Sequence, residues 1–200
     1  MRTVNLCITF LFLTIVSLGQ TIQTGSVLGK NIISVYAGYP IPTSGSTFNR
    51  IYEGVFDVRL AYSMTKKKIS LGGDLGYSYF RISPRILDIG GKMTILTPGI
   101  TAGYGFKVFN KMVIRSLLKC GYDFIAFSGT DADGNFRPAY HDGGISLLPI
   151  VSMEYFFNKN IGIGLSGSYE IIFQHFGNNS VWEESTIRIM DFGIKIIYEL

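Results

Sequence analysis

The chain has 200 residues, of which 47% are hydrophobic and 16% are charged, and its net charge is +4. This length suits one ordinary domain. The charged fraction lies well below the roughly 25% of soluble domains, so the composition excludes intrinsic disorder and supplies little charge for a soluble surface. The longest basic run, Lys66-Lys67-Lys68, is too short for a nucleic-acid-binding stripe. We therefore expect no nucleic-acid partner.

The first residues have the pattern of a secretory signal peptide. Arg2 precedes a mostly apolar stretch, Val4–Val16, and Ser17-Leu18-Gly19 places small residues before a cleavage site at Gln20. The apolar stretch is shorter than the ~20 residues of a membrane-spanning helix. We predict that residues 1–19 are a signal peptide for the general secretory route. Residues 20–30 then form a short tail, and residues 31–200 form the folded domain.

Beyond residue 30 the sequence alternates between apolar and polar residues with a period of two, which indicates β-strands. For example, Ile161, Ile163 and Leu165 alternate with Gly162 and Gly164. The same pattern predicts eight strands, near residues 31–39, 51–63, 68–81, 93–107, 111–126, 144–157, 160–174 and 187–200.

The connections between these strands alternate in length. Those at 64–67, 108–110 and 158–160 are short, and those at 40–50, 82–92, 127–143 and 175–186 are long. An even number of strands, with short turns at one end and long loops at the other, is the layout of outer-membrane barrels. The sequence therefore predicts an all-β fold, an eight-stranded antiparallel up-and-down transmembrane β-barrel.

The polar face of the predicted strands consists mainly of small residues together with charged ones. The charged residues on it are Glu53, Asp57, Arg59, Asp74, Arg115, Lys119, Asp123, Glu154, Glu170, Asp191 and Lys195. Small residues fit the narrow lumen of an eight-stranded barrel, and charges of both signs can pair there. A charge facing lipid costs about 2–4 kcal/mol at the bilayer midplane. We predict that these residues form a charge network in the lumen.

A soluble, lipocalin-like ligand-binding barrel is an alternative, in which the apolar face turns inward and the polar face meets water. The polar face carries too few charges for a soluble surface, which argues against this alternative. Aromatic residues also gather toward both ends of the apolar face, as expected at two membrane interfaces.

Several of these features together resemble a known family. Two strands share a motif, Pro98-x-Ile100-x-Ala102-x-Tyr104-x-Phe106 and its echo from Pro149 to Phe157, and the chain ends with Phe192-x-Ile194-x-Ile196-x-Tyr198-x-Leu200. With the signal peptide and the eight strands, these motifs are similar to the small outer-membrane β-barrel domain family of PorT-like and OmpA/OmpX-like proteins. Over residues 31–200 the resemblance implies the outer membrane of a Gram-negative-type cell, with the lipid bilayer and lipopolysaccharide as partners. It also implies that the barrel-assembly machinery recognises the C-terminal strand.

The sequence offers little catalytic chemistry, and we expect no catalytic, metal-binding or cofactor-binding residues and no cofactor. Gln174–Ser180, which includes His175, faintly resembles the His-x-Ser-Asn element of outer-membrane lipid A deacylases. The residue two positions after His175 is Gly177, which has no side chain to act as a nucleophile. A lipid A-modifying hydrolase that uses His175 therefore stays an alternative function.

Binding function tends to lie on loops that a rigid scaffold carries. Two of the predicted long loops hold side chains of the kinds that make good contact anchors. They are Phe136, Arg137, Tyr140, His141, Phe176 and Trp182. We predict a non-enzymatic outer-membrane protein that presents these loops to an extracellular or envelope protein partner. The PorT-like resemblance implies a role in the assembly of a secretion system.

Overall fold

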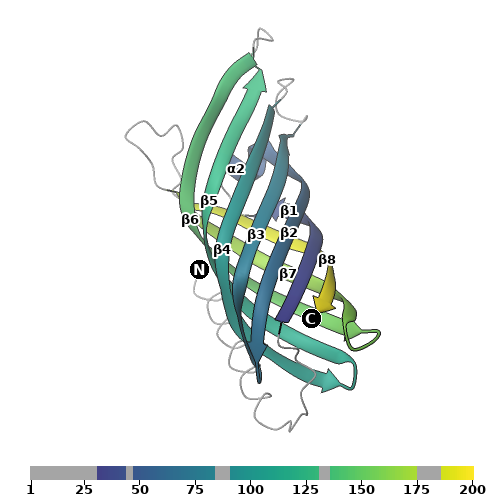
Figure 1. Cartoon of the computed structure of the whole chain (residues 1–200). Coiled ribbons are helices and arrows are strands. Elements are labelled where there is room, and N and C mark those ends of the chain that lie inside the picture. Colours follow the sequence, from purple (N-terminus) through teal and green to yellow (C-terminus); the bar gives the residue numbers. More distant parts are fainter. Residues whose placement is uncertain (1–30, 44–46, 84–90, 131–135, 175–185) are drawn as a thin grey trace, which may run out of the picture.

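The computed structural model describes residues 31–43, 47–83, 91–130, 136–174 and 186–200. These residues form a closed barrel in which each strand pairs with its neighbours in the sequence and β1 pairs with β8 (Figure 1). The strands are β1 (Asn31–Pro42), β2 (Tyr52–Lys66), β3 (Ile69–Ile82), β4 (Gly91–Phe109), β5 (Met112–Thr130), β6 (Phe136–Phe156), β7 (Ile161–Gln174) and β8 (Thr186–Glu199). All pairs are antiparallel. The predicted fold class is confirmed.

One short helix, α2 (Thr47–Ile51), precedes β2, and the sequence pattern did not predict it. Among the described residues, no helix is long and apolar enough to cross a membrane.

The sequence predicted a loop at residues 127–143, but most of this segment forms β-strands, so that prediction is wrong. β5 continues to Thr130 and β6 already begins at Phe136, with Gly129 paired to Arg137. Figure 1 shows this hairpin reaching past the other strands, at the end opposite the short turns. β4 lies beside β5 as far as Gly129, whereas β6 pairs with β7 only from Gly144 onward, so the first residues of β6 form an edge of the sheet. The apolar–polar alternation that marks the other strands is weak here.

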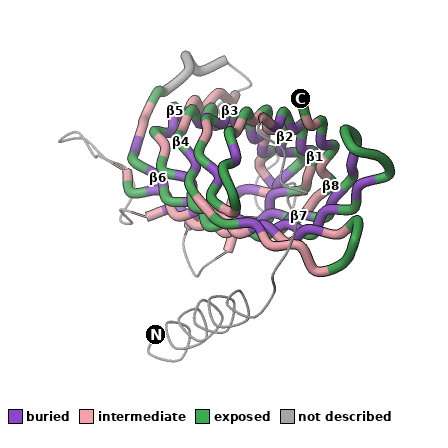
Figure 2. The backbone as a smooth tube through the Cα atoms, turned by 60° about the horizontal axis from the view of Figure 1, so that its bottom comes forward, coloured by how far each residue is buried: buried purple, intermediate pink, exposed green. Residues whose placement is uncertain are grey.

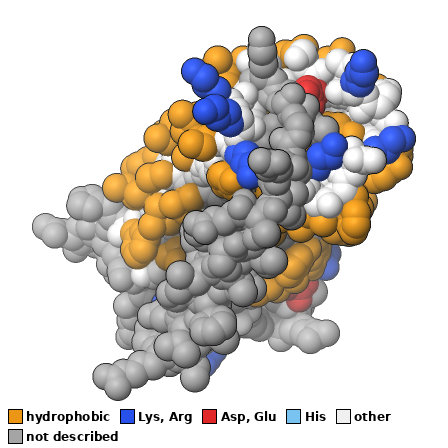
Figure 3. Space-filling model, turned by 90° about the horizontal axis from the view of Figure 1, so that it is seen from below, with side chains coloured by type: hydrophobic (Ala, Val, Ile, Leu, Met, Phe, Trp, Pro, Cys, Tyr) orange, Lys and Arg blue, Asp and Glu red, His pale blue; other side chains and the backbone are white. Residues whose placement is uncertain are grey.

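Where the burial of its residues is described, each strand alternates between exposed and more buried positions over most of its length (Figure 2). The outward side chains are apolar; Leu75 and Ile194, for example, are 48% and 52% exposed. Figure 3 shows hydrophobic side chains around the wall of the barrel, seen from below. Monomeric soluble proteins rarely expose a continuous apolar surface of this kind, whereas a transmembrane barrel requires one.

Exposed aromatic side chains gather toward both ends of this apolar surface. Toward the short turns they are Tyr62, Tyr104, Phe109, Tyr155, Phe157 and Tyr198, and toward the other end they include Tyr39, Phe56, Tyr77, Tyr122, Phe124 and Phe173. Aromatic girdles in these two places are typical of the two interfaces of a membrane. The girdles and the band between them fix which part of the wall faces hydrocarbon.

A β-bulge near the start of β2 reverses the alternation that the sequence predicted there. The register against β3 shifts between Gly54 and Phe56, so Val55 and Phe56 are both exposed while Gly54 is buried. A bulge inserts one extra residue into a strand, so every side chain before it moves to the opposite face.

The bulge removes Glu53 from the predicted lumen network. Its carboxylate instead lies 3.4 Å from the Arg81 guanidinium and accepts a 2.6 Å hydrogen bond from Ser83. Both partners in the ion pair are well exposed, with side-chain exposures of 36% and 61%. The prediction that Glu53 faces the lumen is therefore wrong.

Two lysine substitutions on β7 test the assignment of the faces. Leu165 is 61% exposed on the apolar wall, whereas Ser168 is 9% exposed in the lumen and pairs in register with Asp191. Leu165→Lys places a charge in hydrocarbon and should cost about 2–4 kcal/mol, whereas Ser168→Lys brings a cation to a carboxylate and should cost less. The folded fraction after refolding into phosphatidylcholine vesicles measures the difference. Equal folded fractions for the two variants would show that the faces are wrongly assigned.

Candidate functional site

The lumen is built in layers, with an apolar layer toward each end and a polar layer between them. The layer at the loop end contains Phe48, Tyr52, Phe80, Met93, Ile95, Ile125, Ile172, Ile187 and Ile189, and the layer at the short-turn end contains Ile32, Val113, Phe156 and Ile197. The sequence predicted an inner face of small and charged residues throughout. It missed these layers because near the strand ends both faces of a strand are apolar, as in Ile95-Leu96 and Phe124-Ile125.

Helix α2 contributes to the apolar layer at the loop end. Phe48 projects from α2, and the centroid of its ring lies 5.5 Å from that of Phe80 and 5.4 Å from that of Tyr52. Since Phe48 is only 5% exposed and packs with Tyr52 and Phe80, α2 lies over this end of the lumen.

The polar layer begins with a cluster centred on Arg59. Its guanidinium lies 2.6 Å from the Asp57 carboxylate and 2.9 Å from that of Asp191. The Tyr36 hydroxyl donates a 2.6 Å hydrogen bond to Asp191, and the Ser78 hydroxyl donates a 2.7 Å bond to Asp57. This cluster links β1, β2, β3 and β8, including the pair of strands that closes the barrel.

A second cluster is centred on Glu154, whose side chain is fully buried. Arg115 donates to it with a nitrogen–oxygen distance of 3.0 Å, and Lys195 with one of 2.9 Å. Ser152 donates a 2.9 Å hydrogen bond to the same carboxylate, while Arg115 also donates to Ser70 at 3.0 Å. Strands β3, β5, β6 and β8 are thereby tied together across the lumen.

Lys119 forms a third contact between strands. Its ammonium group pairs with the Asp74 carboxylate and donates a 2.9 Å hydrogen bond to the Thr97 carbonyl. Lys119 is 1% exposed, so its long side chain fills the middle of the lumen as well as pairing a charge.

Two buried carboxyl groups form no ion pair with any residue that the structure describes. Asp123 is 0% exposed, and neither of its side-chain oxygens has a hydrogen-bond partner among the described residues. Glu170 is 4% exposed and forms none of the ion pairs found in the described part of the chain. The lumen therefore contains more carboxyl groups than basic groups, and the excess lies with these two residues on β5 and β7.

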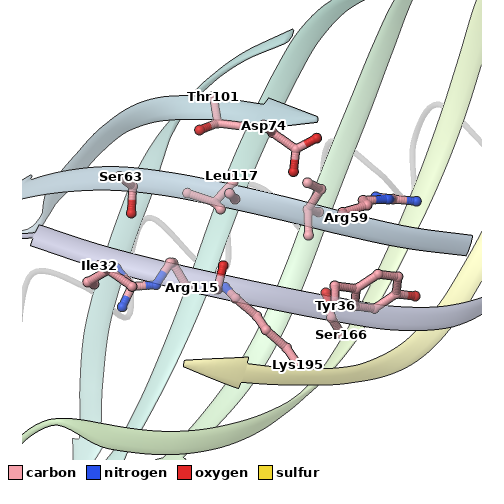
Figure 4. Close-up of a pocket in the computed structure, with 13 residues that line it drawn as sticks. Ile32, Tyr36, Arg59, Ser63, Asp74, Thr101, Arg115, Leu117, Ser166 and Lys195 are labelled. Carbon is pink, nitrogen blue, oxygen red and sulfur yellow. The ribbon is translucent and has the colours of Figure 1, made fainter. Parts of the chain in front are cut away.

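A cavity of about 40 Å³ lies beside the three clusters (Figure 4). Arg59, Asp74, Arg115, Ser166 and Lys195 are among the residues that line it. At about 10–15 Å³ for each water molecule, the cavity has room for about three or four. It is too small for a sugar or a nucleotide. The lumen is thus filled by side chains, as expected for eight strands.

The predicted contact residues are divided between described and undescribed segments. Phe136, Arg137, Tyr140 and His141 lie on β6 in the extended hairpin, where Tyr140 pairs with Phe127 and the side chain of His141 is exposed. Phe176 and Trp182 lie outside the described residues, as does His175, the residue of the alternative hydrolase. The predicted signal peptide, residues 1–19, and the tail, residues 20–30, also lie outside them.

The described residues contain no group of three or more His, Cys, Asp or Glu side chains that could hold a metal ion. Within the polar layer most carboxylates are already bound to Arg or Lys in contacts between strands. The arrangement can hold the strands of the barrel in register, and its chemistry is that of a structural core.

Comparisons with known proteins show the fold. No family model and no curated protein sequence matches the chain. Among solved structures it is similar to Neisserial surface protein A (NspA), with 12% sequence identity, coverage of 89% of this chain and 100% of that one, and a TM-score of 0.58. It is also similar to Ail, the attachment invasion locus protein of Yersinia pestis, solved in complex with the heparin analogue sucrose octasulfate. That match has 16% sequence identity, covers 84% of this chain and 98% of Ail, and has a TM-score of 0.50. At these identities the likeness establishes a shared eight-stranded barrel fold.

Removing the charge of Glu154 tests whether the buried clusters stabilise the barrel. Glu154→Gln leaves Arg115 and Lys195 buried without their carboxylate and should lower the free energy of unfolding by about 3–5 kcal/mol. The matched control, Glu53→Gln, removes a carboxylate from an exposed pair and should cost about 1 kcal/mol or less. Urea unfolding of both variants in lipid vesicles gives the two values. Equal losses in the free energy of unfolding would mean that the buried ion pairs of the lumen stabilise the barrel no more than the exposed pair does.

Proposed function

We propose that the protein is an integral outer-membrane protein of a Gram-negative-type cell. The apolar wall between two aromatic girdles supports this location, because it suits hydrocarbon and not water. Burial of Asp57, Arg115 and Glu154 inside the barrel supports it as well, since charge on the outer wall would be costly in a bilayer. By the usual layout of such barrels, the short turns face the periplasm and the loop end faces outward.

The closed lumen argues that this protein works through its outer end. Apolar layers lie at both ends of the polar layer, and the cavity between them holds only a few water molecules. Among the side chains that the structure describes there, this cavity leaves no space for a substrate or solute to bind or to pass. The barrel is thus best suited to act as a rigid support.

The observation that carries the proposal is the extended hairpin of β5 and β6. These strands have 19 and 21 residues, and β4 beside them has 19, whereas β7 and β8 have 14 each. β6 pairs with β7 only from Gly144 onward, so its earlier residues lie beyond that part of the barrel wall. Function tends to lie on segments that a rigid scaffold holds out. We therefore assign binding to this hairpin.

The partner of the hairpin is an extracellular or envelope protein, with lipopolysaccharide around the barrel as a lipid partner. Arg137, Tyr140 and His141 belong to residue types that supply contact anchors and hydrogen bonds. A secretion-assembly role of the PorT-like kind is one form that such binding takes. Recognition of β8 by the barrel-assembly machinery and export through the general secretory route complete the proposal.

The closed lumen predicts that the protein does not conduct large solutes. Planar-bilayer recordings of the refolded barrel should show no stable open state that passes sugars or larger ions, because side chains fill an eight-stranded lumen. A stable, solute-permeable open state would contradict the rigid-support proposal.

Shortening the hairpin tests where the binding function lies. Because Phe127 pairs with Tyr140, residues 128–139 can be replaced by Asn-Gly, which joins the two strands through a two-residue turn. The barrel should fold as before, and products photocrosslinked in cells from an analogue at position 141 should disappear. The same analogue at Asn158, in a short turn at the opposite end, is the control position. Crosslinked products that survive the shortening would place binding elsewhere.

The acyl-chain composition of lipid A distinguishes the proposed binding function from the alternative hydrolase function. Mass spectra of lipid A should be the same in cells with and without the protein. Loss of an acyl chain that is restored by His175→Ala would instead establish the hydrolase.

A further inference from the structure

The short-turn end of the barrel carries a ring of lysines. Lys66, Lys67 and Lys68 lie at the β2–β3 turn, Lys107 and Lys111 flank the β4–β5 turn, and Lys159 lies in the β6–β7 turn. We call these six residues the lysine rim. All three turns between described strands at this end contain at least one of them. Figure 3, which looks at the molecule from below, shows Lys and Arg side chains spread around this end instead of gathered on one side.

Little negative charge accompanies the lysine rim. Among the described residues, Glu199 is the acidic side chain at this end; the others lie in the lumen or, like Glu53 and Asp142, toward the loop end. Lys66, Lys67, Lys107, Lys111 and Lys159 form no ion pair with a described residue. With six lysines and one acidic side chain among the described residues at this end, the rim is a surface of net positive charge.

The lysine rim lies at the depth of the aromatic girdle. The Lys68 ammonium is 5.8 Å from the centroid of the Tyr104 ring. Lys111 is next to Met112, which pairs in register with Tyr155. Tyrosines of a girdle sit at the headgroup level of a membrane, so these ammonium groups lie at the same level. Lysine is suited to this place, because its apolar stem can follow the wall while its charge reaches the headgroups.

We propose that the lysine rim binds the anionic phospholipid headgroups of the leaflet on the short-turn side. This inference rests on the proposed membrane location. A ring of separate cations at headgroup depth matches a flat layer of phosphates that surrounds the barrel on all sides. A protein partner would touch one sector of the ring and would leave the charges of the other turns unused.

Native mass spectrometry of lipids that stay bound to the full chain tests the proposal. The barrel is released from micelles that contain equal amounts of phosphatidylglycerol and phosphatidylethanolamine. We expect the unchanged chain to retain several-fold more phosphatidylglycerol. Changing all six lysines of the rim to Gln should abolish this preference, whereas changing all six to Arg, which keeps the charge, should preserve it. Added salt should weaken the preference in the unchanged chain, since the contacts are electrostatic.

The outcomes separate this inference from the membrane location. Each variant is first checked for insertion into phosphatidylcholine vesicles, which carry no net charge. Failure of the unchanged chain to insert would overturn the membrane location itself. Insertion of the Gln variant with an undiminished preference for phosphatidylglycerol would overturn the headgroup inference alone. A rim that serves an acidic periplasmic protein would give that same undiminished preference.

Discussion

Closure of the β-sheet is the constraint on which the rest of this structure depends. Pairing β1 with β8 leaves no sheet edge within the barrel wall, so the backbone groups there are satisfied without water. Closure with only eight strands also fixes a narrow lumen that inward side chains must fill. The wall can then be apolar, and the charged side chains of the spanning strands lie in the lumen, where most of them are paired.

The lumen meets this constraint by joining charges from different strands. Arg59 binds Asp191 across the β1–β8 closure, and Glu154 binds Arg115 and Lys195 from two other strands. Removing one member of such a group leaves its partner charged and buried, which is far more costly than losing an exposed pair. Because side chains fill the lumen, the barrel is suited to be a rigid support and not a channel. Partners are then expected to bind at the two ends of the barrel.

In a barrel wall, each strand has an apolar outer face and a more polar inner face, so its residues alternate with a period of two. The sequence predicted the barrel well because this alternation can be read directly from it. It predicted the inward direction of residues such as Asp57 and Lys119 for the same reason. It failed at Glu53, since a single bulged residue, Val55, inverts the faces without changing the composition of the segment. It also missed the hairpin beyond Phe127, where the apolar–polar alternation is weak. The pairing of Arg59 with Asp191 depends on strand register, which the alternation does not encode.

The central claim is that the outer wall of the barrel contacts lipid chains, and fluorescence quenching at one position tests it most directly. Trp182 is the single tryptophan of the chain, so Leu75→Trp in a Trp182→Phe background reports from the middle of the exposed wall. After refolding into vesicles, phospholipids brominated on their acyl chains should quench this fluorescence strongly, and water-soluble acrylamide should quench it weakly. Strong quenching by acrylamide with none by the brominated lipids would contradict a membrane-spanning wall.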